Sequence, residues 1–271
     1  MQAASLVKSG LQFVHEWESK KVQEASRAEL ERMGPSSLDL ESFARWFKHT
    51  FFTFVHSVQC IHCGSSNTSV VGSARPNAFE KAGSANRVEV HKCNSCSGHT
   101  RLPRYNAVTV LLTTRRGRCG EASNLAGALL RAAGYSVRHV TAVEDHVWLE
   151  VFDQASLRWL HYDPCEAALG NPTMYEKGWG KEFTFCIACN IAHTCDVTKS
   201  YSKNWPTTLS RRPHSENAKL CQLLARQTTA LLSRLDHSQR AKELMTILCE
   251  CWDPSKALAE RENEKCKGSE S

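Results

Sequence analysis

The sequence has no long apolar run. None of its 271 residues lie in a segment that approaches the roughly 18 consecutive apolar residues of a membrane-spanning helix. The N-terminus also lacks an apolar stretch of signal-peptide length. We therefore expect no membrane insertion and a location in the cytoplasm, with the nucleus as a second compartment.

Strong charge of one sign is also missing. The 34 Lys and Arg residues exceed the 28 Asp and Glu residues by only six. A nucleic-acid-binding surface would need basic residues gathered on one face, and so mild an excess does not by itself indicate one. We therefore expect no nucleic-acid partner.

The cysteine content does not suit a disulfide framework. Thirteen cysteines is an odd number, which fits free thiols and metal ligands in a reducing compartment. With 41% apolar residues, a chain of this length can bury one sizeable core. We expect one catalytic domain that carries an insertion.

Two C-x-x-C pairs stand out among these cysteines. Cys60 and Cys63 form the first pair, Cys93 and Cys96 form the second, and 29 residues separate the pairs. Four thiolates at such spacing can close a tetrahedral Zn²⁺ site, which leaves no open position for catalysis. We predict one structural zinc per chain. A nucleic-acid-binding zinc ribbon is the rival interpretation, and the lack of clustered basic and aromatic residues near these pairs disfavours it.

A cysteine stands at the head of a segment with helical periodicity. After Gly117–Glu121, apolar residues recur three and four positions apart up to Gly134, the residue type that usually ends a helix. Cys119 then falls in the first turn, where unpaired backbone N–H groups and the helix dipole favour a thiolate. The periodic residues are Ala122, Leu125, Ala126, Leu129, Leu130 and Ala133. Cys119 is therefore a candidate nucleophile.

Two alternating segments follow and predict a β-hairpin. In the first, His146, Trp148, Glu150 and Phe152 share one face, and in the second, Trp159, His161 and Asp163 do. A four-residue loop at 153–156 would set His146 opposite Asp163, Trp148 opposite His161 and Glu150 opposite Trp159. Directly opposed residues lie close enough for a carboxylate to orient an imidazole.

Each of these residues alone is more often structural than catalytic. A cysteine at a helix start is usually a small buried residue, and a lone His or Asp on a strand is usually solvated. The order Cys119, His146, Asp163, with the last two on paired strands, is nevertheless the arrangement of a thiol hydrolase.

At these residues the chain resembles a known family. The similarity runs from about residue 40 to residue 201 and resembles the cytosolic peptide:N-glycanase family of the transglutaminase-like superfamily. The motifs that carry it are Arg104–Asn106, Gly117–Glu121, Asp145–Trp148, Arg158–His161, Asp163–Glu166 and Tyr175–Lys181. The resemblance implies an α+β fold, with a transglutaminase-like (papain-like) core, a four-cysteine zinc module and flanking N- and C-terminal helices.

The resemblance also implies an activity. Members of the family remove N-glycans from misfolded glycoproteins and convert the glycosylated asparagine to aspartate, with a Cys-His-Asp triad at the positions of Cys119, His146 and Asp163. N-glycosylated misfolded proteins would be the substrates, and a ubiquitin-shuttle or proteasome-linked protein would be a further partner. The expected substrate-binding residues are Phe54, Arg138, Trp148, Glu150, Trp159 and Glu166.

This sequence departs from the family at two positions. Relatives typically have tryptophan directly after Cys-Gly-Glu, where this chain has Ala122, and tryptophan at the position of Phe54. We expect both changes to reduce the aromatic surface of the cleft. Two alternatives stay open: a transglutaminase-like protein with another amide substrate, such as a protease or transamidase, and a non-catalytic binding protein.

The remaining segments complete the expected layout. We predict an N-terminal helical segment at 1–39, the catalytic core at 40–202 with the zinc module at about 58–100, helices at 203–252 and a disordered tail at 253–271. Within these, 42–58 is predicted to be helical, 136–143 and 182–197 to form strands, and 203–215 to be a linker. Cys186, Cys189, His193 and Cys195 suggest a second metal, but positions three apart on a strand face opposite sides, so we do not expect one.

Overall fold

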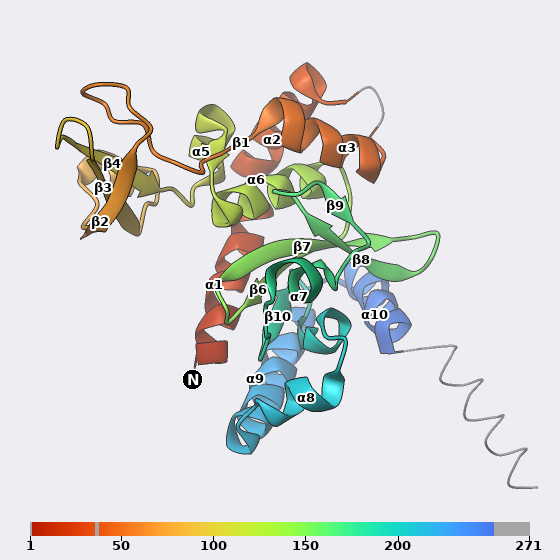
Figure 1. Cartoon of the computed structure of the whole chain (residues 1–271). Coiled ribbons are helices and arrows are strands. Elements are labelled where there is room, and N and C mark those ends of the chain that lie inside the picture. The colour runs from red at the N-terminus through yellow and green to blue at the C-terminus, as the bar shows by residue number, and fades with distance from the viewer. Residues whose placement is uncertain (1, 36–37, 252–271) are drawn as a thin grey trace, which may run out of the picture.

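A six-stranded antiparallel sheet forms the centre of the molecule (Figure 1). The computed structural model describes residues 2–35 and 38–251. The strand order is β11-β10-β6-β7-β8-β9. The strands are β6 (Val137–Ala142), β7 (His146–Asp153), β8 (Arg158–Asp163), β9 (Ala168–Leu169), β10 (Cys186–Cys189) and β11 (Thr194–Asp196).

One helix lies at the centre of the packing. Helix α6 (Cys119–Ala132) is buried at every position from 121 to 130, because it lies between the sheet and two further helices. These are α2 (Lys20–Met33) and α5 (Val108–Thr114), which contact α6 on the side away from the sheet. The burial on all sides exceeds the single apolar face that the sequence pattern indicates.

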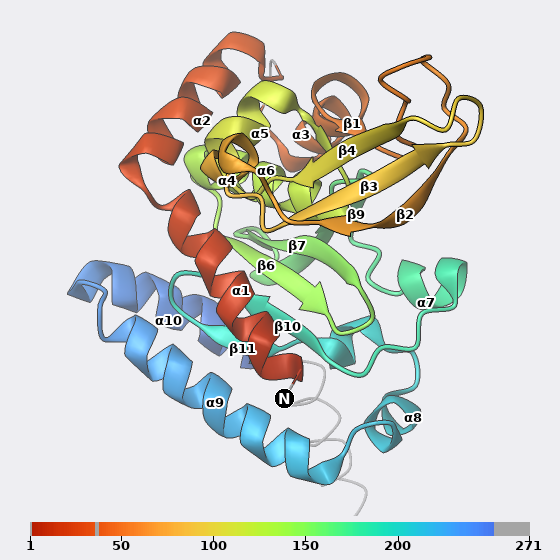
Figure 2. The same ribbon diagram turned by 90° about the vertical axis from the view of Figure 1, so that its left-hand side faces the viewer.

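The N-terminal helices close one side of the sheet. Helix α1 (Gln2–Trp17) crosses β6 and β10, as Figure 2 shows, and α2 follows it after a short break. Trp17 is fully buried and donates from its indole nitrogen to Asn124 of α6 over 2.7 Å. The prediction of helical structure in the N-terminal segment is confirmed.

A three-stranded sheet stands at one side of the core (Figure 1). It has the order β2-β3-β4; β2 and β3 follow the first C-x-x-C pair in the sequence, β3 ends at Cys93 of the second pair, and β4 comes after that pair. Its elements are β2 (Thr68–Ala74), α4 (Ala78–Ala82), β3 (Arg87–Cys93) and β4 (His99–Arg104).

The helix predicted for 42–58 is shorter than expected. It consists of α3 (Leu40–Trp46) and a π-helical turn, η1 (Phe47–Phe51), after which the chain is extended. Strand β1 (Thr53–Phe54) then pairs in parallel with β5 (Arg116–Gly117), directly before α6. The prediction is wrong beyond Phe51, because this backbone forms strand hydrogen bonds with the segment that leads to Cys119.

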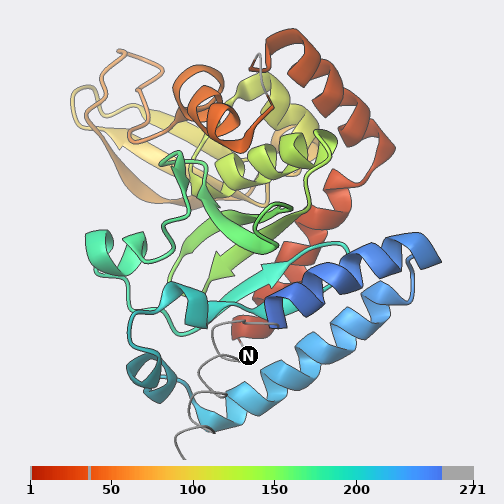
Figure 3. The same cartoon turned by 90° about the vertical axis from the view of Figure 1, so that its right-hand side faces the viewer.

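The C-terminal part of the described chain is helical. Figure 3 shows α9 and α10 beside the β11 side of the sheet. The segment 203–215, predicted to be a linker, contains a short helix with a proline in its first turn, so that prediction is wrong in part. The elements are α7 (Met174–Trp179), the 3₁₀ turn η2 (Thr198–Tyr201), α8 (Trp205–Ser210), α9 (His214–Leu232) and α10 (His237–Cys251). The predicted tail at 253–271 lies outside the described residues.

The predicted hairpin is present, but its register is wrong by two residues. Strands β7 and β8 set Glu150 opposite His161 and Phe152 opposite Trp159, so His146 and Asp163 are diagonal neighbours. The loop spans 154–157, because the Asp153 side chain accepts hydrogen bonds from the turn and remains paired in the strand. A shift of two keeps every side chain on its face, so the predicted faces are correct.

Candidate active site and metal site

The backbone before α6 places Cys119 at the first residue of the helix. Strand β5 is held by β1, and the backbone N–H of Arg118 donates to the Glu121 carboxylate over 3.0 Å, which closes the first turn. Cys119 is partly exposed, whereas the ten residues from 121 to 130 are buried. The fold therefore presents the thiol at the surface of an otherwise enclosed helix.

His146 and Asp163 meet at the open ends of their strands. His146 begins β7 and Asp163 ends β8, and the imidazole Nε2 lies 2.9 Å from Oδ2 of the carboxylate. Asp163 is completely buried and His146 is 7% exposed. Cys119 is near enough to help raise the pKa of the imidazole, and since Nε2 is engaged by Asp163, Nδ1 is the ring nitrogen left for the thiol. The structure thus brings the three predicted catalytic residues together.

The charges of this group favour an imidazolium. Burial lowers the pKa of His146, but the hydrogen bonds to Asp163 and Cys119 outweigh burial and raise this pKa to about 9. Burial raises the pKa of Asp163, yet its hydrogen bonds, first of all that from His146, lower it overall. His146 is therefore positively charged at neutral pH, and a positive charge beside a cysteine is the kind of surrounding that favours a negative sulfur.

Two residues without an assigned role extend this hydrogen-bond chain. The Tyr175 hydroxyl donates to Asp163 Oδ2 over 2.9 Å and lies 2.7 Å from Nε2 of His161. Burial lowers the pKa of His161 to about 4, so its ring is neutral and its Nε2–H donates to the tyrosine oxygen. Asp163 Oδ1 accepts from the backbone N–H groups of Cys165 and Glu166. Every oxygen of the carboxylate is thus fixed by two donors.

Replacement of Tyr175 with phenylalanine tests this arrangement. Without the hydroxyl, Asp163 loses one of its four donors and attracts the proton of His146 more strongly. We expect kcat to be ~10-fold lower and KM to stay within about twofold of the wild-type value. The alkaline limb of the pH–rate profile should move to higher pH. Tyr162 provides the matched control, because its buried hydroxyl has no hydrogen-bond partner among residues 2–35 and 38–251, so Tyr162→Phe should leave the pH–rate profile unchanged. An unchanged profile for Tyr175→Phe would contradict the positioning role.

Two of the predicted substrate-binding residues share a pocket next to the catalytic group. Phe54 and Glu166 line a cavity of about 440 Å³, together with Lys48 and Cys165. Lys48 Nζ lies 3.2 Å from the Glu166 carboxylate, and the Cys165 thiol interacts electrostatically with both Cys119 and Glu166. The pocket therefore adjoins the thiol and offers an aromatic ring, an ion pair and a hydrogen-bond acceptor.

One exposed aromatic residue at this site was not assigned a role from the sequence. Trp179 ends α7, is 45% exposed, and its ring centroid lies 5.0 Å from that of His146. It belongs to the Tyr175–Lys181 motif, which is the only signal in the sequence that could have identified it.

Three predicted substrate-binding residues lie elsewhere. Arg138 is 2% exposed, forms an ion pair with Glu150 and another with Glu250 of α10 at 2.7 Å, and its guanidinium lies 4.3 Å from the Trp159 ring centroid. These residues line a different cavity, of about 460 Å³, beside α10. Protein partners already satisfy Arg138 and Glu150, so their surroundings indicate a structural role.

Trp148 and Ala122 are core residues. Trp148 is fully buried among Tyr175, Phe183 and Tyr201, and its ring centroid lies 5.7 Å from that of His146. The Trp148 ring therefore packs beside His146 inside the core, and no part of it is exposed to contact a substrate. Ala122 is also fully buried.

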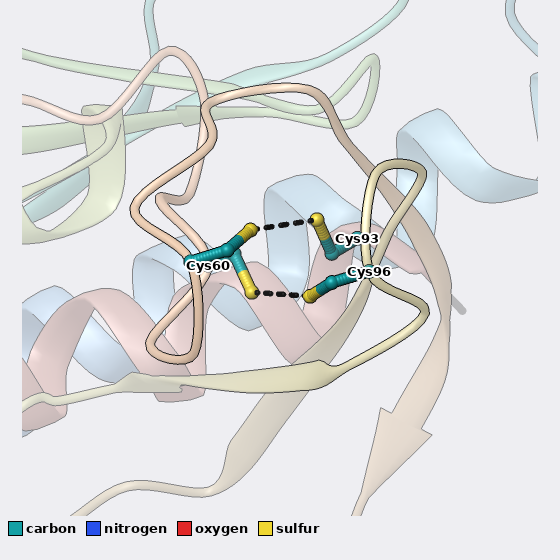
Figure 4. Close-up of side chains that lie close together, drawn as sticks. Cys60, Cys93 and Cys96 are labelled. Carbon is teal, nitrogen blue, oxygen red and sulfur yellow. Dashed lines mark hydrogen bonds between the residues drawn. The ribbon is translucent and has the colours of Figure 1, made fainter.

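The four cysteines of the C-x-x-C pairs come together. All four Sγ atoms lie within 4.8 Å of one another, and Cys60–Cys96 and Cys63–Cys93 are separated by 3.5 and 3.6 Å. Figure 4 shows Cys60, Cys93 and Cys96 pointing toward a common centre. A tetrahedral ion with Zn–S bonds of about 2.3 Å needs sulfur separations of about 3.8 Å. The cluster can therefore hold a metal ion with only small adjustments.

A second group of metal-ligating residues does not fit a cation. His193, Cys195 and Glu250 lie within 4.8 Å of one another, but the Arg138 guanidinium is 3.2 Å from the Cys195 sulfur. Its positive charge occupies the position a cation would take. Cys186 and Cys189 belong to different clusters on opposite faces of β10, as the strand period predicts.

Comparison with known sequences relates this core to a superfamily. The sequence model of the transglutaminase-like superfamily matches residues 67–164, a range that contains Cys119, His146 and Asp163. No helix in the described part of the chain has the length and apolarity needed to cross a membrane.

Several curated relatives carry one name. The chain is 36% identical over 213 residues to the peptide-N(4)-(N-acetyl-beta-glucosaminyl)asparagine amidase of Saccharomyces cerevisiae, covering 78% of this chain and 57% of the relative. Identity to the Homo sapiens protein of the same name is 36%, over 88% of this chain and 37% of the relative. Identity to the Caenorhabditis briggsae protein of this name is 43%, over 60% of this chain and 27% of the relative. The chain thus spans between about a quarter and somewhat more than half of these relatives.

Solved structures with a similar fold also exist. A crystal structure of Rad4-Rad23 bound to a 6-4 photoproduct UV lesion aligns with a TM-score of 0.52 at 14% identity, over 90% of this chain and 56% of that chain. A Rad4-Rad23 structure crosslinked to undamaged DNA aligns with a TM-score of 0.53 at 12% identity, over 92% and 56%. At such low identity the likeness concerns the fold alone.

Proposed function

We propose that this chain, of which residues 67–164 match the transglutaminase-like superfamily, is a peptide:N-glycanase, which hydrolyses the side-chain amide of glycosylated asparagine. The observation that carries this proposal is the Cys119–His146–Asp163 group on a core that is 36–43% identical to amidases of this name. The substrates would be N-glycosylated proteins, and their unfolded segments would reach the partly exposed thiol most readily.

The reaction follows from the geometry of the three residues. The Cys119 thiolate attacks the amide carbon of the glycosylated asparagine, and the backbone N–H groups at the head of α6 lie close to the developing oxyanion. His146 donates its Nδ1 proton to the amide nitrogen as the C–N bond breaks, which releases the glycosylamine and leaves a thioester. A water molecule gives a proton to His146 and attacks the thioester, which yields aspartate and the free thiol. Asp163 holds the imidazole in place throughout.

The surroundings of the thiol suit a glycan attached to a peptide. Trp179 offers an exposed ring beside His146, and aromatic faces commonly pack against sugar rings. The pocket that contains Phe54 and Glu166 is also lined by Cys165, and the Glu166 carboxylate can accept hydrogen bonds from sugar hydroxyls. We assign the first sugars of the glycan to these residues.

The metal and the cellular setting belong to the same proposal. A structural zinc at Cys60, Cys63, Cys93 and Cys96 would fix the three-stranded sheet and supply no catalytic step. We place the protein in the cytoplasm, where misfolded glycoproteins are handed to degradation, with a ubiquitin-shuttle or proteasome-linked protein as a partner.

Mass analysis of a denatured high-mannose glycoprotein tests the reaction. After incubation with the protein, the peptide should have aspartate at the former glycosylation site, and the intact glycan should appear in solution. The natively folded glycoprotein, whose glycosylation site is less accessible, is the matched control and should react more slowly.

Each rival predicts a different product. A peptide that keeps one sugar would indicate cleavage between sugars. Cleaved or crosslinked peptides with the glycan still attached would indicate a protease or transamidase. No product from folded, zinc-loaded protein would favour a non-catalytic binding protein.

A further inference from the structure

A network of ion pairs joins the three-stranded sheet to the head of α6. Arg104, the last residue of β4, donates from Nε to Glu121 Oε1 over 2.6 Å and from Nη2 to Oε2 over 2.8 Å. This fork-shaped contact joins the helix to the three-stranded sheet and its four-cysteine cluster, together called the metal-binding module. Strand β4 belongs to that module, and Glu121 is the third residue of the helix that begins with Cys119.

The network continues within the module. Arg104 Nη1 donates to Glu89 of β3 over 2.7 Å, and the Arg118 guanidinium lies 3.1 Å from the other oxygen of Glu89. Arg118 precedes Cys119 directly. The Glu121 and Glu89 side chains are 6% and 9% exposed, and that of Arg104 is 15% exposed, so these charges have few water molecules to replace a lost partner.

Glu121 controls the shape of the helix start. Its carboxylate accepts from the backbone N–H of Arg118 over 3.0 Å while it is bound to Arg104. Its side chain also lies against Gly117, where an added Cβ would come within 2.4 Å of the Glu121 Cβ. The position of this carboxylate therefore fixes the backbone on both sides of Cys119.

Glu121 also has an electrostatic consequence for the thiol. An unpaired buried carboxylate two residues away would oppose a negative sulfur and cancel part of the positive helix end. The Arg104 guanidinium neutralises that charge, so Glu121 can shape the backbone without repelling the thiolate.

We propose that Arg104 is a positioning residue for Cys119, supplied by the metal-binding module: it anchors the head of α6 and neutralises Glu121. The proposal rests on the proposed function only in that Cys119 is the reacting thiol. It gives the module a defined part in catalysis, because β4 carries a charge that the nucleophile needs.

The variant Arg104→Gln tests this role with two measurements. Alkylation of Cys119 by iodoacetamide at pH 7 should slow ~10-fold, and kcat for glycan release should fall by a similar factor with KM within about twofold. Arg101 supplies the matched control, because it lies on the same strand and makes the same fork-shaped contact with Glu80, away from α6. Arg101→Gln should change both rates less than about twofold.

Two further variants distinguish charge from structural damage. The double variant Arg104→Gln/Glu121→Gln leaves no unpaired carboxylate at the helix head, so Cys119 alkylation should return to within about threefold of the wild-type rate. Arg104→Lys keeps the charge but loses the fork, and its rate should fall between those of wild type and Arg104→Gln. Zinc content and far-UV circular dichroism check that every variant is folded.

Several outcomes would overturn the proposal. Alkylation of Cys119 in Arg104→Gln at the wild-type rate would do so. An equally large fall of the alkylation rate in Arg101→Gln would do so too, because it would show general damage to the module. If Arg104→Gln does not retain zinc, the alkylation rate is measured in the double variant Arg104→Gln/Glu121→Gln instead. Slow alkylation of Cys119 in that variant, when it is folded, would refute the role of charge. Alkylation needs no glycoprotein, so slow alkylation of Arg104→Gln beside an inactive wild type would refute the proposed function alone.

Discussion

Replacement of Cys119 with alanine is expected to abolish glycan release, a loss of ~10⁴-fold or more. In the proposed reaction the Cys119 sulfur forms the bond to the asparagine side chain, and neither His146 nor Asp163 can substitute for it. Because Cys119 is partly exposed at the head of α6, alanine should leave the fold and the melting temperature nearly unchanged. The rate is measured by release of glycan from a denatured glycoprotein.

Cys221 is a suitable control for the same experiment. It lies exposed on α9, and Cys221→Ala should retain full activity. Residual turnover by Cys119→Ala above about one thousandth of the wild-type rate would mean that another group carries the reaction.

The pH dependence of the thiol follows from the raised pKa of His146. The imidazole stays positive up to about pH 9, so its attraction for a negative Cys119 sulfur is present at neutral pH and is lost as the pH rises through that value. Iodoacetamide at pH 6 should therefore label Cys119 before the more exposed Cys221. Equal labelling of the two cysteines would contradict the thiolate–imidazolium pair.

Removal of the metal is expected to have the second large effect. Elemental analysis should find about one zinc per chain, and Cys93→Ser should lower the melting temperature by ~10 °C, because metal binding stabilises only the folded module. Glycan release should fall with it, since β4 of this module contacts the head of α6 through Arg104.

Cys165→Ser provides a control for the loss of a partly buried thiol that is not a predicted metal ligand. Cys165 lies at the active site, so the readouts for this variant are zinc content and melting temperature, both of which should stay close to those of wild type. Protein that melts unchanged after the metal has been removed by a chelator would exclude a structural zinc.

Much of this protein could be predicted from short-range patterns in its sequence. The two C-x-x-C pairs indicated a metal cluster, because residues three apart in a tight knuckle present two thiols to the same ion. Helical spacing placed Cys119 at the head of α6, and strand alternation placed His146 and Asp163 on one face. These features depend on the periods of helix and strand, which are properties of the local backbone.

The register of the β7–β8 hairpin could not be predicted from such local patterns. Its faces could be predicted from the strand period, but its register depended on where the turn begins, and Asp153 stays paired because its side chain caps the turn. A shift of two residues leaves the faces intact, so His146 still reaches Asp163, but across a diagonal. The predicted pair was therefore correct although the predicted register was wrong.

Only the tertiary structure decided which polar and aromatic residues face the thiol. Trp148 and Ala122 are buried, and Arg138 binds Glu250 from a helix more than a hundred residues away. Tyr175 reaches Asp163, and Arg104 reaches Glu121, from separate elements. The sequence by itself determined the chemical groups and their order along the chain. Their burial and partners arise from contacts between distant segments, and no local period encodes such contacts.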